Sequence, residues 1–430
     1  MWSPIAKDRT LKAAEAAGLP RNPVLHTEPE AAALATLRDK ADDDTLRVAS
    51  HLLSAMLAVD LISYRIRRIY PLAIDECAIG DGGLCGSIWQ DIAFENMMVG
   101  IIGEAEMKRM KPINKRRMMK SFETIKRGFD GKDREFMVDL RDVEPNESMG
   151  IYDDFMLLKL SHLRTIFDLV CDQIDRLVTQ QINDARTGGN VIKAILLVGG
   201  FGMNKYLHGY LAKSYHNERI RVIQVDGAWS AIARGACMWG LEQCENGIPP
   251  SLRDSDLFDL KNDRGTVASR ISKYSYGFLM QHPFDANIHH MDELVTDKYS
   301  GITYATNQMT WILKRGESVD TGRRLLQTVF HTVEKYCPRQ SFSTAVYYSE
   351  KDNPPQRLAD GPHQLCEVSY TISDSQVRLS PLYPCKMGLG DVRDLDFDLY
   401  LIPGNAMLEF QVKYQNVTMA QTKAKYVEDF

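Results

Sequence analysis

The feature that most constrains the fold of this chain is the stretch at residues 194–207, AILLVGGFGMNKYL. An apolar run is broken by Gly199, Gly200 and Gly202, and apolar residues then return at helical spacing. This order predicts a buried strand, a glycine turn and a helix. Glycines at the end of a strand let a ligand approach the backbone, and the N–H groups that start the next helix suit an anion or a polar ring. Taken alone, the pattern is equally typical of a tight connection in any α/β domain.

Length, charge and composition exclude several classes of protein. A chain of 430 residues exceeds what one hydrophobic core usually covers, so two or three lobes are predicted. The net charge of −5 argues against a nucleic-acid partner. A basic cluster at 108–120 lacks interleaved aromatic residues, so it predicts a solvated helix face and no nucleic-acid site. Long apolar runs are absent and 1–10 does not resemble a signal peptide, which argues against membrane insertion and secretion. Scattered cysteines without metal-ligand spacing predict reduced thiols in a cytoplasmic protein.

The composition predicts helical structure between residues 88 and 126, and the end of this segment carries three charged side chains at helical spacing. The sequence at 122–129 is FETIKRGF, which places Glu123, Lys126 and Arg127 at positions i, i+3 and i+4. Residues at this spacing share one helix face, so the three side chains are expected to converge on one ligand. The alternative is an ordinary surface ion pair within the helix.

Two alanine-rich helices are also predicted. The first, EPEAAAL at 28–34, has Pro29 in its first turn, where a missing N–H is no loss. The second, AIARGACMWGL at 231–241, has small residues that allow close packing against a sheet. A long apolar stripe at helical spacing predicts a further helix at 163–178, which ends at Gly188.

The pattern changes after residue 250. Apolar and polar residues alternate most clearly at 408–414, which predicts a half-buried strand. The rest of this part is predicted to be an antiparallel β domain with no catalytic constellation. Its other expected strands lie at 310–313, 344–348, 366–372 and 395–402.

In chain order, the segments EPEAAAL, FETIKRGF, LVGGFG and AIARGA resemble the actin-like ATPase fold of the 70-kDa heat-shock protein (heat shock protein 70) family, in particular its divergent branch in fungi and animals. The resemblance implies an α/β protein in which an incomplete actin-like ATPase (ribonuclease H-like) lobe precedes a β-rich C-terminal domain. It divides the chain into a remnant of lobe I at 1–46, lobe II at 47–246 with a helical subdomain at about 96–155, and a β-rich domain at 251–430.

The resemblance also implies a nucleotide site for ATP or ADP with Mg²⁺. Among catalytic groups, Glu28 matches a glutamate that positions the attacking water, and Asp60 matches an aspartate that holds Mg²⁺-bound water. The cofactor-binding residues that it implies are Glu123 for the ribose hydroxyls, Lys126 and Arg127 along the adenine, Gly199, Gly200 and Gly202 beneath the adenine and ribose, and Met203 in place of an arginine that stacks on the base.

Both phosphate loops of the family lack a counterpart in this sequence. The resemblance begins near Trp2, after the first loop and the catalytic lysine, and LSAMLA at 53–58 replaces the Asp-x-Gly-Gly-Gly-Thr sequence of the second. Apolar side chains neither cradle a phosphate nor bind Mg²⁺, so no metal ligand is predicted and hydrolysis is expected to be lost. One hypothesis is that 54–59 is the second loop translated out of frame, and the other is a genuine apolar strand.

Three functions stay open from the sequence. The first is an ATP-binding, chaperone-like protein that binds adenine nucleotides but does not hydrolyse them. The second is a non-catalytic interaction protein, a pseudo-ATPase used as a scaffold. The third is a nonfunctional product of a faulty gene model. By analogy with the family, a polypeptide client or protein partner is expected to bind a loop or edge of the β domain.

Overall fold

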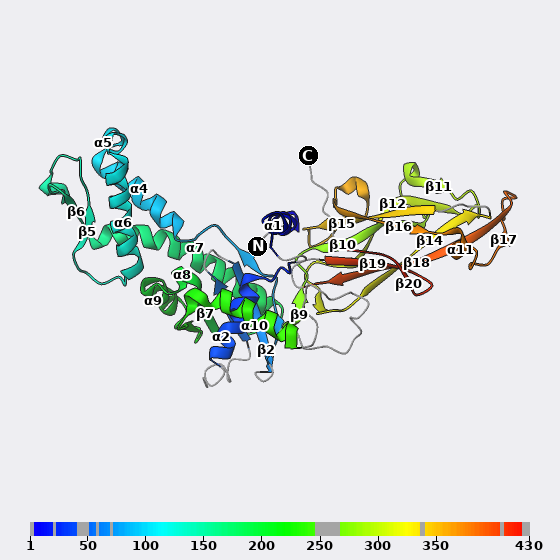
Figure 1. Ribbon diagram of the computed structural model, residues 1–430, viewed down its shortest axis with the longest axis horizontal. Coiled ribbons are helices and arrows are strands. Elements are labelled where there is room, and N and C mark those ends of the chain that lie inside the picture. The colour runs from blue at the N-terminus through cyan, green and yellow to red at the C-terminus, as the bar shows by residue number, and fades with distance from the viewer. Residues whose placement is uncertain are drawn as a thin grey trace. The chain divides into compact units, whose positions relative to one another are not determined.

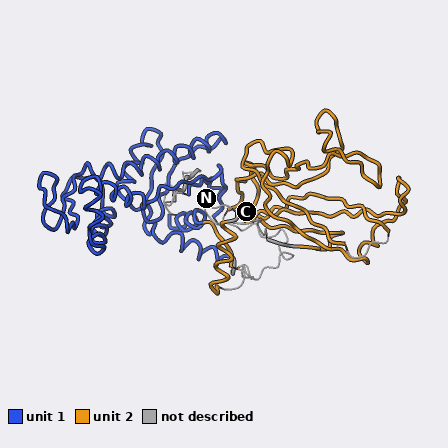
Figure 2. Tube along the Cα trace, turned by 90° about the horizontal axis from the view of Figure 1, so that it is seen from above, with its two compact units in different colours: residues 1, 28–249 blue, residues 2–27, 250–430 orange. Residues whose placement is uncertain are grey.

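In the computed structural model of the protein (Figure 1), the described residues are 4–19, 23–40, 51–56, 60–68, 72–245, 267–335, 340–404 and 408–423. Contacts divide the chain into two compact units (Figure 2). The first comprises Met1 with Glu28–Pro249, and the second comprises Trp2–Thr27 with Pro250–Phe430. Helix α1 (Pro4–Ala16) therefore belongs to the second unit. The prediction of a mixed α/β chain with a β-rich C-terminal part is confirmed.

The sheet of the first unit mixes parallel and antiparallel strands. Within this unit its order is β3-β2-β1-β7-β8. Strands β1, β7 and β8 are parallel, and β2 is antiparallel to both β1 and β3. All side chains of β7 are buried, as expected for an inner parallel strand. The strands are β1 (His51–Met56), β2 (Asp60–Arg68), β3 (Ala73–Glu76), β7 (Ala194–Val198) and β8 (Arg221–Gln224), with β4 (Asp81–Gly82) paired to the start of β2.

Two alanine-rich helices, both predicted from the sequence, cross against this sheet. They are α2 (Glu28–Asp39) and α10 (Ala231–Glu245), and Ala32 and Ala35 pack with Val198 of β7. At the crossing the two backbones almost touch: a Cβ placed on Gly235 would lie 1.7 Å from the carbonyl oxygen of Ala31. Small residues are therefore required here because the helices approach each other through their main chains.

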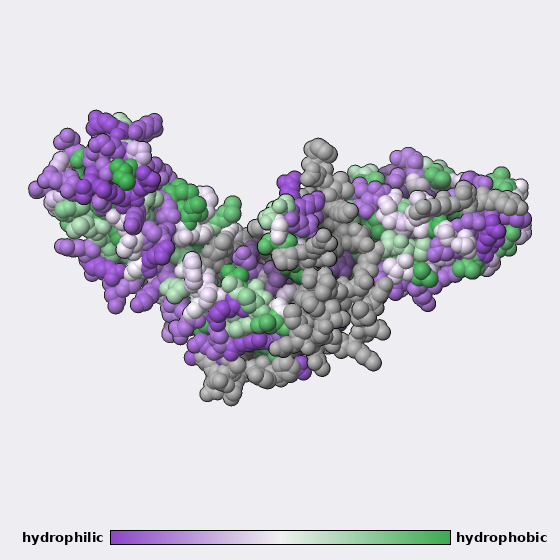
Figure 3. Space-filling model, viewed as in Figure 1, coloured by the Kyte–Doolittle hydropathy of each residue, from purple (hydrophilic) through white to green (hydrophobic). Residues whose placement is uncertain are grey.

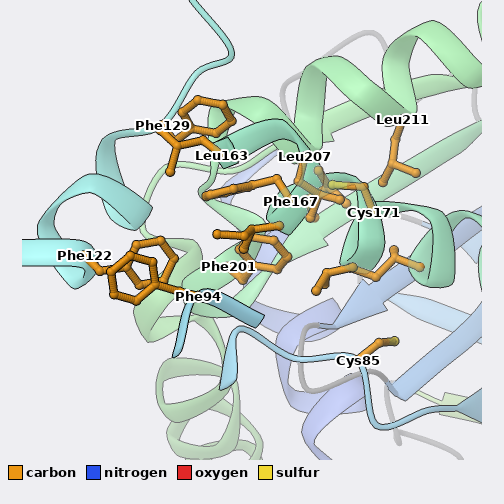
Figure 4. Packing of buried hydrophobic residues seen from close by; sticks show 14 of the residues in the cluster. Cys85, Phe94, Phe122, Phe129, Leu163, Phe167, Cys171, Phe201, Leu207 and Leu211 are labelled. Atoms are coloured by element: carbon orange, nitrogen blue, oxygen red, sulfur yellow. The ribbon is translucent and has the colours of Figure 1, made fainter. Parts of the chain in front are cut away.

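A helical region lies between β4 and β7 in the chain. The rings of Phe94 and Phe122 stack in its core with centroids 4.0 Å apart, and Phe129 packs on Phe167 at 4.4 Å (Figure 4). The predicted long helix is confirmed as α7 (Leu160–Thr187). Its apolar stripe is buried, it ends at Thr187, and Gly188 caps it. The elements of this region are α4 (Ile88–Ile102), α5 (Glu104–Arg109), α6 (Pro112–Gly128), β5 (Phe136–Asp139), the 3₁₀ turn Glu147–Met149, β6 (Phe155–Leu158) and α7 (Leu160–Thr187).

The basic residues of this region lie on a solvated surface. Lys108 pairs with Glu104 at 2.7 Å within α5, and Lys115 of α6 pairs with Glu95. Figure 3 shows that the described surface around α5 and α6 is mostly hydrophilic, with scattered apolar residues. In the described part of the chain, no helix is both long enough and apolar enough to cross a lipid bilayer.

The second unit contains two antiparallel sheets that share one apolar core. Phe278, Val346 and Tyr370 of one sheet and Phe397 and Phe410 of the other belong to the same buried cluster. The first sheet is β11 (Leu294–Thr296), β12 (Thr303–Leu313), β10 (Ser275–Pro283), β15 (Gln340–Ser349) and β16 (His363–Ile372), in that order. The second is β14 (Leu325–Glu334), β18 (Asp391–Pro403), β19 (Leu408–Tyr414) and β20 (Val417–Lys423), with β17 (Tyr383–Pro384) beside β18.

Each predicted strand of the C-terminal part is found in this unit. The alternation at 408–414 corresponds to β19, in which Phe410 and Val412 are buried. The remaining elements of the unit are β9 (Val267–Ile271), paired with β13 (Ser318–Asp320), the 3₁₀ turns Met291–Glu293 and Leu358–Asp360, and α11 (Asp374–Val377).

One partly buried imidazole should make the stability of this unit depend on pH. His331 of β14 stacks on Phe342 at 4.2 Å, and burial lowers its pKa below the ordinary value of 6.5. The unfolded chain binds the proton more readily, so the free energy of unfolding should be highest above about pH 6.5 and fall at lower pH. His331 contributes at most about 1.4 kcal/mol per pH unit to this slope. This dependence of the free energy of unfolding on pH is measured by urea unfolding at several pH values, with hydrogen exchange in β14 and β18 as the probe.

The variant His331→Phe removes this titration and should flatten the acid limb. A matched control is His290→Asn, because His290 lies exposed next to the Met291–Glu293 turn. If His331→Phe and His290→Asn show the same dependence on pH, burial of His331 does not cause the acid sensitivity.

Candidate functional site

The glycine segment that follows β7 forms one turn of helix, α8 (Gly199–Gly202). Only Gly199 adopts a positive φ, of 80°, so its neighbours continue directly into helical geometry. Gly202 is buried and Gly200 is exposed, which leaves the backbone of Gly200 open to approach. The predicted order of strand, glycines and helix is confirmed, with α9 (Lys205–Ser214) as that helix.

Asn204 joins this glycine turn to the end of α6. Its side-chain Nδ2 donates to the carbonyl oxygens of Lys126, at 3.1 Å, and Phe129, at 3.4 Å. Its Oδ1 accepts from the backbone N–H groups of Tyr206 and Leu207 and so caps α9. The residue is only 4% exposed. The glycine turn and the charged end of α6 therefore form one corner of the first unit, which we call the α6–α8 corner (residues 123–127 and 199–204).

A second amide fixes the same turn from the sheet side. Nε2 of Gln224, at the end of β8, donates to the carbonyl oxygens of Gly202, at 2.7 Å, and Asn204, at 3.1 Å. Both carbonyl groups lie where the turn passes into α9. The turn is therefore held in one conformation by two side-chain amides.

The three charged residues of α6 form one ion-pair network. Nζ of Lys126 lies 2.6 Å from Glu123 and 2.7 Å from Asp91 of α4, and Nε of Arg127 lies 2.7 Å from Glu123. The side chain of Lys126 is 8% exposed, whereas that of Glu123 is 39% exposed. Partial burial opposes ionisation of Glu123, but hydrogen bonds from Lys126 and Arg127 outweigh it and keep the pKa of this carboxyl below its usual value. Glu123 is therefore an ionised acceptor at the edge of the corner.

Two apolar side chains flank the glycine turn. Trp229, in the 3₁₀ turn Ala228–Ser230, is 75% exposed, and Met203 is 50% exposed. A Cβ built on Gly200 would lie 3.4 Å from the indole ring of Trp229, so this ring lies directly beside the exposed glycine. Exposed apolar surface next to an accessible backbone suits a planar, partly apolar ligand.

The two residues expected near the phosphates lie on other elements. Glu28 is the exposed first residue of α2, and Asp60 begins β2, opposite Gly82 of β4. Residues 51–56 form β1, within the stretch that the resemblance aligns with a phosphate loop, and 57–59 lie outside the described residues. Within the described parts of the chain, no group of three or more His, Cys, Asp or Glu side chains is placed to hold a metal ion.

Three residues that hold the corner in place were not predicted from the sequence: Asn204 lies within it, and Asp91 and Gln224 contact it from other elements. Asn204 carried a usable signal, because asparagine directly before an apolar-periodic segment is a typical helix cap. Asp91 carried none, since it lies 35 residues from its partner Lys126. Gln224 carried none either, because its role depends on the docking of β8 beside β7.

Comparison with known proteins adds one finding. Residues 270–428 match a protein family described as a domain of unknown function (DUF8568). This match lies inside the second unit and does not include the α6–α8 corner. No curated protein matches the chain.

Proposed function

We propose that the first unit is the second lobe of an actin-like ATPase of the heat shock protein 70 type and that it binds the adenosine part of ATP or ADP at the α6–α8 corner without hydrolysis. The observation that carries this proposal is the bridge made by Asn204. Glu123, Lys126 and Arg127 were expected to contact the adenosine together with Gly199, Gly200 and Gly202, and Asn204 ties the two groups into one corner.

The topology of the sheet supports the same proposal. If the two-residue strand β4 is set aside, the strands that the first unit contributes to its main sheet stand in the order 3-2-1-4-5 when numbered along the chain, and only the second is antiparallel to its neighbours. This arrangement is typical of ribonuclease H-like lobes, which actin-like ATPases contain. Ligands of open α/β sheets bind beyond the carboxyl ends of the strands, and α8 lies at that end of β7.

The corner offers contacts to a nucleoside and few to phosphates. The carboxylate of Glu123 can accept hydrogen bonds from two ribose hydroxyls, and the base can lie on the backbone of Gly200 between Met203 and Trp229. The loop that would receive the phosphates is replaced by LSAMLA. Each lost charged hydrogen bond removes about 1.5–3 kcal/mol, so adenosine, ADP and ATP should bind with similar, weak affinity and without a need for Mg²⁺.

The variant Glu123→Gln should weaken binding of adenosine and ADP about tenfold. It removes the charged acceptor for the ribose, and hydrogen bonds to charged groups contribute about 1.5–3 kcal/mol. Calorimetric titration of the full chain measures the affinities. With 2′-deoxyadenosine as ligand, the variant should lose less affinity, because this ligand lacks one of the two ribose hydroxyls that donate to Glu123.

Glu104→Gln is the matched control, because Glu104 forms a similar i,i+4 pair with Lys108 on α5. It should leave the affinity for adenosine unchanged. Absence of any heat with millimolar adenosine and ADP, together with no effect of Glu123→Ala, would rule out nucleotide binding by this chain.

A second candidate is a non-catalytic interaction protein that binds a polypeptide partner through its second unit. It is favoured by one observation, a wide cleft in that unit at which strand edges are open. The chaperone-like role follows from the resemblance to the heat-shock family and is proposed on that ground. The cytoplasmic location is proposed from the scattered cysteines, which lack the spacing of metal ligands.

A further inference from the structure

The second unit contains a cleft of about 1270 Å³. Strands of both sheets contribute its walls: β10, β12, β15 and β16 from one sheet, and β14, β17 and β18 from the other. All of its lining residues belong to the second unit, so the cleft is independent of the α6–α8 corner. The lining residues also lie within residues 270–428, which match the domain of unknown function.

The cleft opens where β10 and β15 part. Their pairing runs from Ser275 opposite Ser349 to Phe278 opposite Val346. Beyond this point β10 continues beside β12 and β15 continues beside β16. The β10 ladder is irregular between Met280 and His282, and the β15 ladder is irregular after Val346. Such irregularities bend strands and end their pairing, which explains the split in the sheet.

The split leaves strand edges that lack a neighbouring strand. Leu279 and Met280 of β10 line the cleft, and so do Phe342–Ala345 of β15. β14 is the terminal strand of its sheet, and its residues 329–334 line the cleft without a gap. Within the described residues, none of these three edges is paired with a further strand on the side of the cleft. An extended polypeptide is the ligand whose own backbone can bond to such edges.

The charge of the cleft indicates the kind of polypeptide. Glu367 and Asp396 are exposed at its wall, and Lys386 is its only lysine or arginine among the described lining residues. Some carboxylates are already occupied, since Asp394 accepts from Thr332 at 2.6 Å and Asp297 accepts from Ser300 at 2.7 Å. Aromatic side chains at the wall add surfaces that suit a cation. They are Tyr299, Tyr304, Phe330, Phe342 and Tyr383.

We propose that this cleft binds an extended polypeptide segment rich in lysine or arginine by strand addition. The backbone of the segment bonds to an open strand edge, and its cationic side chains face Glu367 and Asp396. The proposal deepens the second candidate function, the interaction role, and it does not depend on nucleotide binding.

The test is a binding titration of the full chain with a peptide of about ten residues in which lysine alternates with valine. The peptide carries a neutral fluorophore, and fluorescence anisotropy reports binding. We expect saturable binding that weakens as salt increases, because the attraction is partly electrostatic. The double variant Glu367→Gln with Asp396→Asn should weaken binding of the peptide about fivefold, because two exposed ion pairs with the peptide are lost together.

Two matched peptides separate charge from strand addition. One alternates glutamate with valine, and the other keeps lysine and valine but carries a methyl group on every second backbone nitrogen. Both should bind much more weakly than the lysine–valine peptide. The first has the wrong charge, and the second cannot donate backbone hydrogen bonds along one of its edges. Equal binding of either peptide would overturn the proposal, and so would an absence of binding by the lysine–valine peptide.

The control variant is Asp292→Asn with Glu350→Gln, two exposed carboxylates of the same unit that do not line the cleft. It should bind the lysine–valine peptide as the parent chain does. If the control weakens binding as much as the cleft variant, the effect is one of net charge and the site is wrong. The same variants should bind adenosine like the parent chain, so a failure here is distinguishable from a failure of the nucleotide proposal.

Discussion

Replacing Gly235 with alanine is expected to destabilise the first unit by about 3 kcal/mol or more. The new Cβ would lie 1.7 Å from the carbonyl oxygen and 2.4 Å from the carbonyl carbon of Ala31. Both are main-chain atoms, so no side chain can rotate away and the two helices must separate. Separation would uncover the alanines and valines that α2 and α10 bury against the sheet. Urea unfolding, followed by hydrogen exchange in β7, measures the loss.

Gly240→Ala is the matched control for this prediction. Gly240 lies in the same helix, and a Cβ placed there meets no atom within 4 Å. Alanine is favoured over glycine in a helix by up to about 1 kcal/mol, so this variant should be neutral or slightly more stable. If both variants are equally destabilised, the close crossing of α2 and α10 is not the cause.

Replacing Asn204 with alanine should cost the first unit about 2–4 kcal/mol, because two contributions are lost together. Loss of the cap on α9 costs about 1 kcal/mol. The carbonyl groups of Lys126 and Phe129 also lose a buried donor, at about 1–3 kcal/mol. The α6–α8 corner loosens as a result, so affinity for adenosine should fall as well.

Asn204→Asp distinguishes the two contributions. The carboxylate can still cap α9, but it cannot donate to the carbonyl groups of Lys126 and Phe129. We therefore expect a chain with α9 intact and reduced affinity for adenosine. Asn183→Ala, at an exposed position of α7, is the control and should leave both properties unchanged. Full affinity for adenosine in Asn204→Asp would mean that the bridge to α6 does not shape the corner.

Elements with a strong local pattern were predictable from the sequence. The uninterrupted apolar run of β7, the helical stripe of α7 and the alternation of β19 each reflect one period of the backbone. The convergence of Glu123, Lys126 and Arg127 follows from the helix alone. These features need no knowledge of what packs against them.

Features that depend on distant segments were not predictable in the same way. The pairing of Lys126 with Asp91 needs α4 and α6 to dock, and the placement of α1 in the second unit needs contacts far along the chain. The cleft depends on irregular pairing in β10 and β15. This irregularity leaves no clear mark on the alternation of apolar and polar residues, so the sequence did not predict it. Single-residue periodicity carries no information on where two paired strands part.

The crossing of α2 and α10 also determines when the first unit can fold during synthesis. Asp39 of α2 is bonded to Arg234 of α10, and these residues are 195 positions apart in the chain. Strand β1 likewise cannot pair in the sheet until β7 has been synthesised, because its Leu52 pairs with Ala194. Contacts of such long range are slow to form and leave apolar surface exposed while the ribosome completes the remaining residues. The nascent first unit should therefore be vulnerable to aggregation until α10 has emerged.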